Sequence, residues 1–416
     1  MQWLNRAMLR LHTENTLDRE EKIMSEWLKT SLIDIVELIG GGTPKTSKAE
    51  YWGGNINWLS VKDFNNENRY VYSTEKTITE EGLNNSSTKL LRKDDIIISA
   101  RGTVGELAMI PFPMAFNQSC YGIRAKEGID STFLYYLIKH SVRKLKAMTH
   151  GSVFDTITRD TFANIDVAIP DIEMQQRVAK MLANIDDKVE NNQRINNNLL
   201  EQVLALYRNR FVDTVNNKRR ICRADEYFDI SIGKTPPRKE PQWFSTNPQD
   251  VTWVSISDMG TCGLYIGSSS EQLTKEAVDR HNVKIVPDNT VLLSFKLTVG
   301  RIAITNGEMT TNEAIAHFKT DKKEINEYLY CYLKCFNYQT MGSTSSIATA
   351  VNSKIIKGMP FVVPTDDELI DFHSVAAPMF AKIKANQTES EKLTAVRDTL
   401  LPKLMSGELD VSDIDL

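Results

Sequence analysis

Cysteine is scarce in this sequence of 416 residues, and its pattern fits neither a metal site nor a disulfide framework. The five cysteines include no C-x-x-C pair, and none has a histidine partner at the spacing of a zinc site. Cys331 and Cys335 lie four residues apart in a stretch that we predict to be helical. We interpret them as buried free thiols in a reducing compartment, and we predict no zinc site.

Long apolar runs are also absent. No hydrophobic segment approaches the ~20 residues that cross a bilayer, and the opening MQWLNRAMLRLHTENTLDREEK is too charged for a signal peptide. We therefore expect a cytoplasmic protein with no membrane partner. The hydrophobic content of 41% and charged content of 25% are those of a globular protein, and the length suggests two or three domains.

A surplus of basic residues is missing as well. The formal net charge is −4, which excludes a uniformly basic coat for nucleic acid. The last ten residues contain four acids and no base, and without them the 50 remaining acids equal the 50 lysines and arginines. A surface that binds a polyanion must therefore be local, or a partner must complete it.

Two stretches look like phosphate-binding loops but lack what such a loop needs. They are IGGGTPKTS at 39–47 and IGKTPPRK at 232–239. The loop requires a glycine, four residues and Gly-Lys-Ser/Thr, so that successive backbone N–H groups point at the phosphates. Pro44 precedes Lys45 and has no N–H to offer, and Phe228 stands where the second loop needs its first glycine.

Other catalytic signatures are absent. The sequence has no N-P-P-F/Y or D-P-P-Y stretch of an adenine methyltransferase, no G-x-G-x-x-G after a strand, and no G-x-S-x-G. Asp171 and Asp288 lack the downstream acid-x-Lys of a metal nuclease, and we interpret Asp186 and Asp187 as the solvated face of a helix. We predict no catalytic site, bound cofactor or metal in this chain.

The two false phosphate loops occupy the same position in two copies of one domain. RGTVGELA begins at Arg101 and KLTVGRIA at Lys296, a displacement of 195 residues. The same displacement aligns Trp58 with Trp253, and FLYYLIK at 133–139 with YLYCYLK at 328–334. Each copy begins with strand-like runs and glycine-rich turns and ends in a helical stretch. The chain is therefore predicted to be a tandem repeat.

Each helical stretch carries the 4-3 spacing of a coiled-coil seam. The first seam consists of Val178, Leu182, Ile185, Val189, Asn192, Asn196, Leu199, Val203 and Leu206. The second consists of Phe372, Ala376, Met379, Ile383, Asn386, Ser390, Leu393, Arg397 and Leu400. Asn192 and Asn386 occupy the same layer, where a polar residue costs stability and can fix the register. Pro378 falls inside the second seam, so we expect that helix to kink or restart there.

These patterns predict an α+β fold with two mixed α/β domains in tandem. Two long helices separate and join the domains and are expected to form an antiparallel coiled coil with approximate two-fold symmetry. The predicted parts are an N-terminal extension at 1–23, a first domain at 24–169, a central helical region at 170–214, a second domain at 215–364, a C-terminal helical region at 365–408 and an acidic tail at 409–416. The extension has no counterpart in the second half, and it is either a loosely held helix or the product of an upstream start codon.

A pair of such helices can act as a ruler. From Asp171 to Phe211 the helix would extend ~60 Å at ~1.5 Å per residue, and DNA offers equivalent major-groove faces every ~34 Å. A rigid spacer between two groove-reading domains therefore specifies a split target with a fixed gap.

Cations and aromatic residues gather on the turn-rich segments around the false phosphate loops, and such segments can contact phosphate and sugar. Asn117-Gln118 aligns with Asn312-Glu313. Gln can read adenine and Glu can accept from cytosine N4, so this difference suits two half-sites. The candidate DNA contacts are Lys45, Thr46, Lys48, Trp52, Asn55, Lys62, Arg101, Thr103, Asn117 and Gln118 in the first copy, and Lys234, Arg238, Lys239, Trp243, Lys296, Thr298, Arg301 and Asn312 in the second.

A purely structural interpretation accompanies each candidate. The loops can be solvated caps of a sheet, and RGTVG and KLTVG can be tight turns between two buried strands. Trp58 and Trp253 lie in strand patterns, so we predict them to be core residues.

The ending LLPKLMSGEL at 400–409 resembles that of the specificity subunits of type I restriction-modification systems. GGTPKTSKAEYWGGNINWLSVKDF and IPDIEMQQRVAKMLANIDDKV match the same family, and the resemblance covers residues 24–410. It implies two target recognition domains, each reading half of a bipartite double-stranded DNA sequence, and two conserved helical regions that dock two methylation subunits. Those subunits would hold S-adenosylmethionine, and motor-nuclease subunits using ATP and Mg²⁺ would join the assembly.

Two other functions stay open on the sequence alone. One is a coiled-coil scaffold whose domains bind proteins and have no DNA specificity. The other is a self-sufficient nuclease or methylase, which the missing motifs disfavour.

Overall fold

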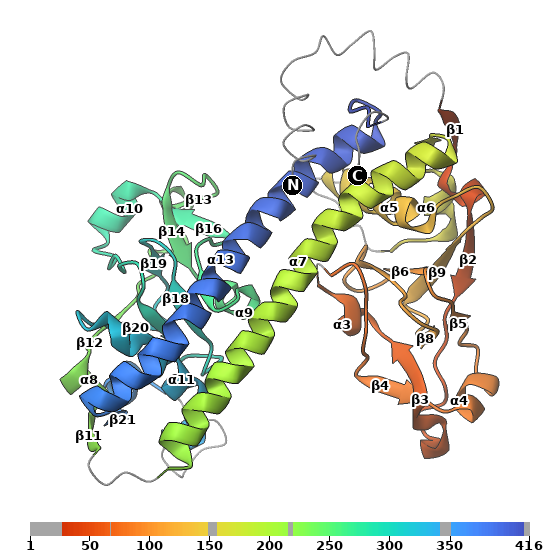
Figure 1. The fold of residues 1–416 in the computed structure, drawn as a ribbon. Helices are drawn as coiled ribbons and strands as arrows, with labels where there is room; N and C mark the ends of the chain where they lie inside the picture. The colour runs from red at the N-terminus through yellow and green to blue at the C-terminus, as the bar shows by residue number, and fades with distance from the viewer. Residues whose placement is uncertain (1–26, 67, 149–155, 215–218, 342–350, 412–416) are drawn as a thin grey trace. The chain divides into compact units, whose positions relative to one another are not determined.

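The computed structural model describes residues 27–66, 68–148, 156–214, 219–341 and 351–411 (Figure 1). The predicted N-terminal extension lies outside these residues, as does most of the acidic tail. The chain forms two compact units. The first contains residues 1–190 and 390–416, and the second contains residues 191–389. Each unit thus combines one predicted domain with part of each long helix.

The first unit contains two four-stranded sheets and a strand pair. The antiparallel sheet has the order β2 (Val36–Gly40), β9 (Cys120–Ala125), β6 (Ile96–Ser99) and β7 (Leu107–Met109). The mixed sheet has the order β4 (Lys76–Ile78), β3 (Trp52–Leu59), β8 (Met114–Phe116) and β5 (Leu90–Leu91). The pair is β1 (Leu28–Ser31) with β10 (Asp166–Ile169). The shorter helices are η1 (Leu32–Ile35), η2 (Ala49–Tyr51), α3 (Val61–Phe64), α4 (Glu80–Asn84), α5 (Ser131–Met148) and α6 (Arg159–Ala163).

The second unit repeats this plan. Its larger sheet has the order β12 (Asp229–Ile232), β20 (Ile315–Lys319), β17 (Val291–Ser294), β18 (Ile302–Thr305) and β15 (Tyr265–Ile266). Its mixed sheet has the order β13 (Phe244–Ser245), β16 (Glu271–Leu273), β14 (Val251–Val254) and β19 (Thr310–Thr311). The pair is β11 (Arg220–Arg223) with β21 (Pro360–Val363). The shorter helices are α8 (Ala224–Tyr227), η4 (Pro241–Trp243), α9 (Asp258–Thr261), α10 (Lys275–Arg280), η5 (Lys323–Ile325), α11 (Asn326–Cys335), η6 (Tyr338–Met341) and α12 (Ser353–Lys357).

The strand register confirms the predicted repeat residue by residue. Trp58 pairs in parallel with Ala115, and Trp253 pairs in parallel with Thr310, so both members of the pair are displaced by 195. Both tryptophans are buried, with exposed fractions of 7% and 2%, which confirms their prediction as core residues. The cysteines in the described residues are free.

The two long helices are α7 (Ile172–Tyr207), which continues as a π-helical turn (Arg208–Val212), and α13 (Asp366–Met405). The side chain of Asp171 accepts from Met174 N at the start of α7, and Gly407, with a φ of 72°, follows the end of α13. α13 continues through Pro378, so the helix does not restart there. Pro378 and Ser374 are exposed, and water can satisfy the carbonyl that loses its N–H partner.

Within each unit, parts of both long helices complete the hydrophobic core. In the first unit, Val178 and Leu182 of α7 share a core with Leu400 and Leu404 of α13. Leu404 is fully buried in this core, with an exposed fraction of 0%. In the second unit, Val203, Leu204 and Tyr207 of α7 share a core with Leu369, Phe372, Ala376, Phe380 and Ile383 of α13.

The asparagines predicted to share a layer are buried and linked in the second unit. Asn192 and Asn386 have exposed fractions of 0% and 1%. Asn192 Nδ2 donates to the carbonyl oxygen of Asn386 at 3.4 Å, and Asn386 Nδ2 donates to Asn196 Oδ1 at 2.8 Å. These bonds satisfy polar groups that would otherwise be costly to bury.

Asp186 corrects the sequence interpretation of a solvated helix face. Its exposed fraction is 6%. It accepts from Tyr136 Oη at 2.6 Å and from Arg397 Nη1 at 2.7 Å, and this pairing compensates the buried carboxylate. Asp187 is exposed but forms an ion pair with Arg69. Residues 50 to 211 positions away supply these partners, so the local sequence does not reveal them.

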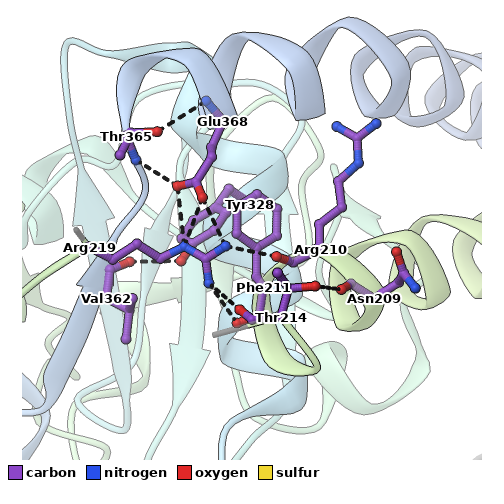
Figure 2. Close-up of polar contacts among 9 residues, drawn as sticks. All are labelled: Asn209, Arg210, Phe211, Thr214, Arg219, Tyr328, Val362, Thr365 and Glu368. Atoms are coloured by element: carbon purple, nitrogen blue, oxygen red, sulfur yellow. Dashed lines mark hydrogen bonds and ion pairs between the residues drawn. The ribbon is translucent and has the colours of Figure 1, made fainter. Parts of the chain in front are cut away.

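Arg219 fastens the end of α7 to the start of α13 in the second unit (Figure 2). Its guanidinium contacts both carboxylate oxygens of Glu368, at 2.9–3.2 Å. It also donates to the backbone carbonyls of Arg210, Phe211 and Thr214 at 2.8–3.2 Å. All five N–H groups of the guanidinium are therefore used, and carbonyls at a helix end gain partners.

We expect Arg219→Lys to loosen this joint although it keeps the charge. Lysine is a point charge and cannot make the planar fork, so carbonyls near residue 211 lose their donors at a cost of ~1–3 kcal/mol. Hydrogen exchange of amides 208–214 should speed up in the full chain. The matched control is Arg220→Lys, at an exposed neighbour, and equal exchange in the two variants would contradict the role of Arg219.

Candidate nucleic-acid interface

Three segments of each domain converge through backbone hydrogen bonds. We name them the TP loop (41–48 and 233–239), the Asn turn (116–119 and 311–314) and the hairpin tip (100–106 and 295–301). In the first domain, Gly42 N donates to Phe116 O at 2.9 Å, and Ala100 N donates to Ser119 O at 2.8 Å. The Asn turn thus lies between the other two segments, and we call the assembled surface the recognition edge.

The second domain forms the same recognition edge. Lys234 N donates to Thr311 O at 2.9 Å, and Phe295 N donates to Ala314 O at 2.9 Å. A side-chain contact across the edge is also repeated. Thr43 Oγ1 donates to Gln118 in the first domain, and Thr235 Oγ1 donates to Glu313 in the second.

Glycine in the TP loop permits close packing and does not cradle phosphate. A Cβ at Gly41 would lie 2.1 Å from Asn117 O, and a Cβ at Gly233 would lie 2.1 Å from Thr311 Oγ1. Both distances are far below van der Waals contact, so the backbone can approach the Asn turn only without a side chain. This approach accounts for the repeated glycine that resembled a phosphate loop.

The hairpin tips confirm the prediction of tight turns between buried strands. The tip of the first domain joins β6 to β7, and that of the second joins β17 to β18. In the second domain, Ser294 Oγ donates to Thr298 O at 2.6 Å and accepts from Arg301 N at 3.0 Å. Ser99 makes the same two contacts in the first domain. A buried serine therefore fixes each tip from below.

Most of the candidate side chains are exposed. The exposed candidates are Lys45, Thr46, Asn55, Lys62, Arg101, Thr103, Gln118, Lys234, Arg238, Lys239, Lys296 and Thr298. Asn117 and Asn312 are half-buried, and their side-chain oxygens accept from Ser119 N and Ala314 N. These two asparagines therefore shape the turn.

Several cations and aromatic residues selected from the sequence contact other side chains of their own domain. Trp243 is 4% exposed, and its Nε1 donates to Glu240 at 2.9 Å, so it is a core residue and not a surface contact. Arg238 makes two bonds of 2.9 Å to Glu271 and stacks on Phe244, with 4.1 Å from its guanidinium carbon to the ring centroid.

Arg301, Lys48 and Trp52 are likewise engaged within their own domains. Arg301 Nη1 donates to Ile256 O at 2.6 Å. Lys48 Nζ donates to Tyr51 Oη at 3.1 Å, and Trp52 Nε1 donates to Lys45 O at 3.3 Å. Periodicity and composition could not separate these side chains from free ones, because their contacts depend on how the turns fold.

The two edges differ in charge at their centres. Burial raises the pKa of Glu313, but the hydrogen bond from Thr235, a backbone N–H and the charges of Lys296 and Arg238 outweigh it and bring the pKa below its usual value. Glu313 is therefore ionised at neutral pH. The first domain has the neutral Gln118 at this place.

His317 is a residue of the second edge that the sequence reasoning missed. It is 0% exposed and takes the register position that Gly122 holds in the first domain. Its Nδ1 lies 3.0 Å from Ser231 Oγ and its Nε2 lies 2.7 Å from Thr311 Oγ1. It thereby connects β12, which leads to the TP loop, with β19, which leads to the Asn turn. The sequence signal that could have revealed His317 is its alignment with Gly122 of the first copy, because a polar residue replaces a glycine there.

We expect the second edge to weaken in mild acid through His317. Burial, and the charge of Lys319, lower its pKa from 6.5 to about 3. The unfolded chain therefore binds the proton more tightly. The stabilisation is complete above pH ~6.5 and decreases, by up to ~1.4 kcal/mol per pH unit, as the pH falls toward 3.

Hydrogen exchange of amides 311–319 in the full chain checks this expectation. Between pH 6 and pH 4, the free energy of opening should fall more steeply in the wild type than in His317→Gln, which cannot titrate. Parallel curves for the two proteins would show that His317 does not carry the pH dependence.

Comparison with known proteins identifies the family. The model of the type I restriction modification DNA specificity domain matches residues 24–201 and again residues 221–394. The chain belongs to this family. It is a specificity subunit with two recognition domains, and the curated relatives are likewise named as specificity subunits and not as catalytic ones.

Relatives resemble this specificity subunit over most of its length. The type I restriction enzyme MjaIX specificity subunit of Methanocaldococcus jannaschii is 28% identical, over 94% of this chain and 96% of the relative. The HindI specificity subunit of Haemophilus influenzae is 22% identical, over 64% and 74%. The crystal structure of a type I S subunit from M. genitalium has a TM-score of 0.51 at 16% identity, over 91% of this chain and 96% of that one.

The described residues offer neither a membrane-spanning helix nor a cluster of metal ligands. No helix there is long and apolar enough to cross a membrane. No group of three or more His, Cys, Asp or Glu side chains within the same residues could hold a metal ion.

Proposed function

We propose that this specificity subunit reads a bipartite DNA sequence, with one half-site for each recognition edge. The observation that carries the proposal is that the same edge is built twice with a different central side chain, Gln118 or Glu313. Identical support from Thr43 and Thr235 holds the two side chains at equivalent positions. Two recognition edges with the same backbone contacts but different central side chains are suited to bind two different base sequences.

The central side chains offer opposite hydrogen-bonding groups. Thr43 occupies Gln118 Oε1, so the exposed Nε2 is left as a donor for guanine O6 and N7 or thymine O4. Thr235 occupies Glu313 Oε2, so Oε1 is left as an acceptor for cytosine N4 or adenine N6. The exposed lysines around each edge supply phosphate contacts, which position the protein but carry no sequence information.

Partner subunits supply the chemistry in this proposal. The helical regions at 170–214 and 365–408 dock two methylation subunits that bind S-adenosylmethionine. Motor-nuclease subunits, which use ATP and Mg²⁺, join through that complex. The absence of catalytic motifs from the sequence and the similarity to proteins named specificity subunits support this division of labour.

Exchanging the central side chains tests base reading. In the complex with methylation subunits, Glu313→Gln should change the preferred base at one position of one half-site and leave the other half-site intact. Gln118→Glu should do the same to the opposite half-site. One hydrogen bond to a base discriminates by ~0.5–1.5 kcal/mol, or about 2- to 13-fold. Sequencing of modified bases in cells that carry each variant measures the change.

The control for charge is Glu308→Gln, which removes an exposed acid of the second domain outside the recognition edge. It should leave both half-sites unchanged. A wild-type complex that binds its methylation subunits but prefers no DNA sequence would refute the proposal and leave a protein-binding scaffold.

The long helices set the gap between half-sites in this proposal, as paired rods of a coiled coil. Inserting four residues after Asn196 in α7 and four after Asn386 in α13 adds about one turn, or ~6 Å, to each helix. The gap should grow by one to two base pairs while both half-sites stay the same, because DNA advances ~34 Å in 10 base pairs. Methylation mapping that returns the old gap, or altered half-sites, would contradict the ruler.

A further inference from the structure

Leu297 is a fully exposed apolar residue at the hairpin tip of the second domain. Its exposed fraction is 99%, whereas the strands on either side of the tip, β17 and β18, are buried. A leucine in this position stabilises no core and leaves its whole side chain in water. Folding therefore gives no reason for a leucine here.

The backbone at Leu297 is also one that leucine disfavours. Its φ is 60°, and Thr298 N donates to Lys296 O at 2.6 Å across it, so the leucine is the central residue of a tight turn with positive φ. Gly102 takes the aligned position in the first domain with a φ of 80°. Glycine adopts this region without strain and leucine does not, so strain and exposure both oppose leucine here.

The tip holds Leu297 on a fixed base. Ser294 Oγ donates to Thr298 O at 2.6 Å, and Gly300 N donates to Ser294 O at 3.0 Å. A Cβ added at Gly300 would lie 3.2 Å from Tyr338 Cε2, so that side chain covers the base of the turn. The leucine therefore projects from a braced turn.

The neighbours of Leu297 on the recognition edge are charged. Lys296 precedes it, and the charge of Lys296 lowers the pKa of Glu313 on the Asn turn. A fully exposed apolar side chain thus follows a cation that can bind phosphate, and that cation lies near enough to Glu313 to lower the pKa of its carboxylate. An apolar side chain among charged ones matches the major groove of DNA, where the methyl group of thymine lies among polar base edges.

We propose that Leu297 contacts the C5-methyl group of a thymine in the half-site read by the second domain. The major groove admits a two-stranded β-ribbon, and the β17–β18 hairpin presents its tip as one. Thymine is the base with a methyl group in that groove, and apolar contact distinguishes it from the other three. This assignment rests on the proposed function and adds a specificity residue to it.

The test replaces thymine by deoxyuridine, which removes only the methyl group. The wild-type complex with methylation subunits is titrated with its mapped target carrying deoxyuridine at each thymine of the second half-site in turn. One position should bind about four-fold more weakly, the factor equivalent to burying one methyl group. In the Leu297→Gly complex, the thymine and deoxyuridine duplexes should bind equally at that position.

Leu297→Gly is a safe variant because it relieves the strained φ and reproduces the glycine of the first domain. It should fold at least as well as the wild type, so lost discrimination cannot come from unfolding. Ile221→Ala is the matched control. It shortens another exposed apolar side chain of the second domain, on β11, which pairs with β21 and shares no strand with the recognition edge. It should keep the wild-type preference for thymine.

Other outcomes separate this assignment from the proposed function. If the wild type binds all deoxyuridine duplexes as well as the thymine duplex, or if Leu297→Gly keeps the discrimination, the thymine contact is wrong although the bipartite target stands. If Leu297→Gly lowers the affinity for the thymine duplex and for the deoxyuridine duplex by the same factor, the difference between the duplexes persists. The leucine then contacts another part of the DNA, and the assignment is again wrong. If the wild-type complex has no mapped target, the proposed function itself fails.

Discussion

Burial of apolar surface from distant parts of the chain is the constraint on which this structure depends. The core of the first unit joins strands and α5 of the first domain to Val178 of α7 and to Leu400, Leu404 and Leu409 near the end of the chain. The core of the second unit joins its sheet to both helices in the same way. Neither domain covers its apolar face alone, so each recognition edge stands on a frame to which both helices contribute.

The two domains contact the long helices through different kinds of side chain. The first domain meets the helices through a buried ionic cluster in which Asp186 accepts from Tyr136 and Arg397. The second uses aromatic rings, with the centroids of Tyr207 and Tyr328 5.4 Å apart and those of Phe211 and Tyr328 4.8 Å apart. Removing one partner from the ionic cluster leaves a buried charge, whereas aromatic packing weakens gradually.

Repetition and periodicity are properties of the sequence, and they were enough to predict the tandem domains, the long helices, the tight turns and the buried tryptophans. The surface interpretations of Trp243 and Asp186 were wrong because both side chains are buried, and burial depends on packing that the local sequence does not show. The roles of His317 and Leu297 were not predicted, because the burial of one side chain and the positive φ of the other cannot be read from the sequence. Alignment of the copies places Gly122 opposite His317 and Gly102 opposite Leu297. Only the structure shows that the first difference adds buried hydrogen bonds and the second adds an exposed, strained leucine.

The divided core of the first unit has a consequence for biosynthesis. The ribosome makes residues 400–411 after every residue of the second unit, yet Leu400, Leu404 and Val411 belong to the core of the first. An apolar face of the first domain therefore stays uncovered until residues 400–411 are made. The second unit is continuous in sequence and can fold before that. Nascent chains stalled before residue 400 would be the aggregation-prone species, and a chaperone would find its binding surface on the N-terminal half.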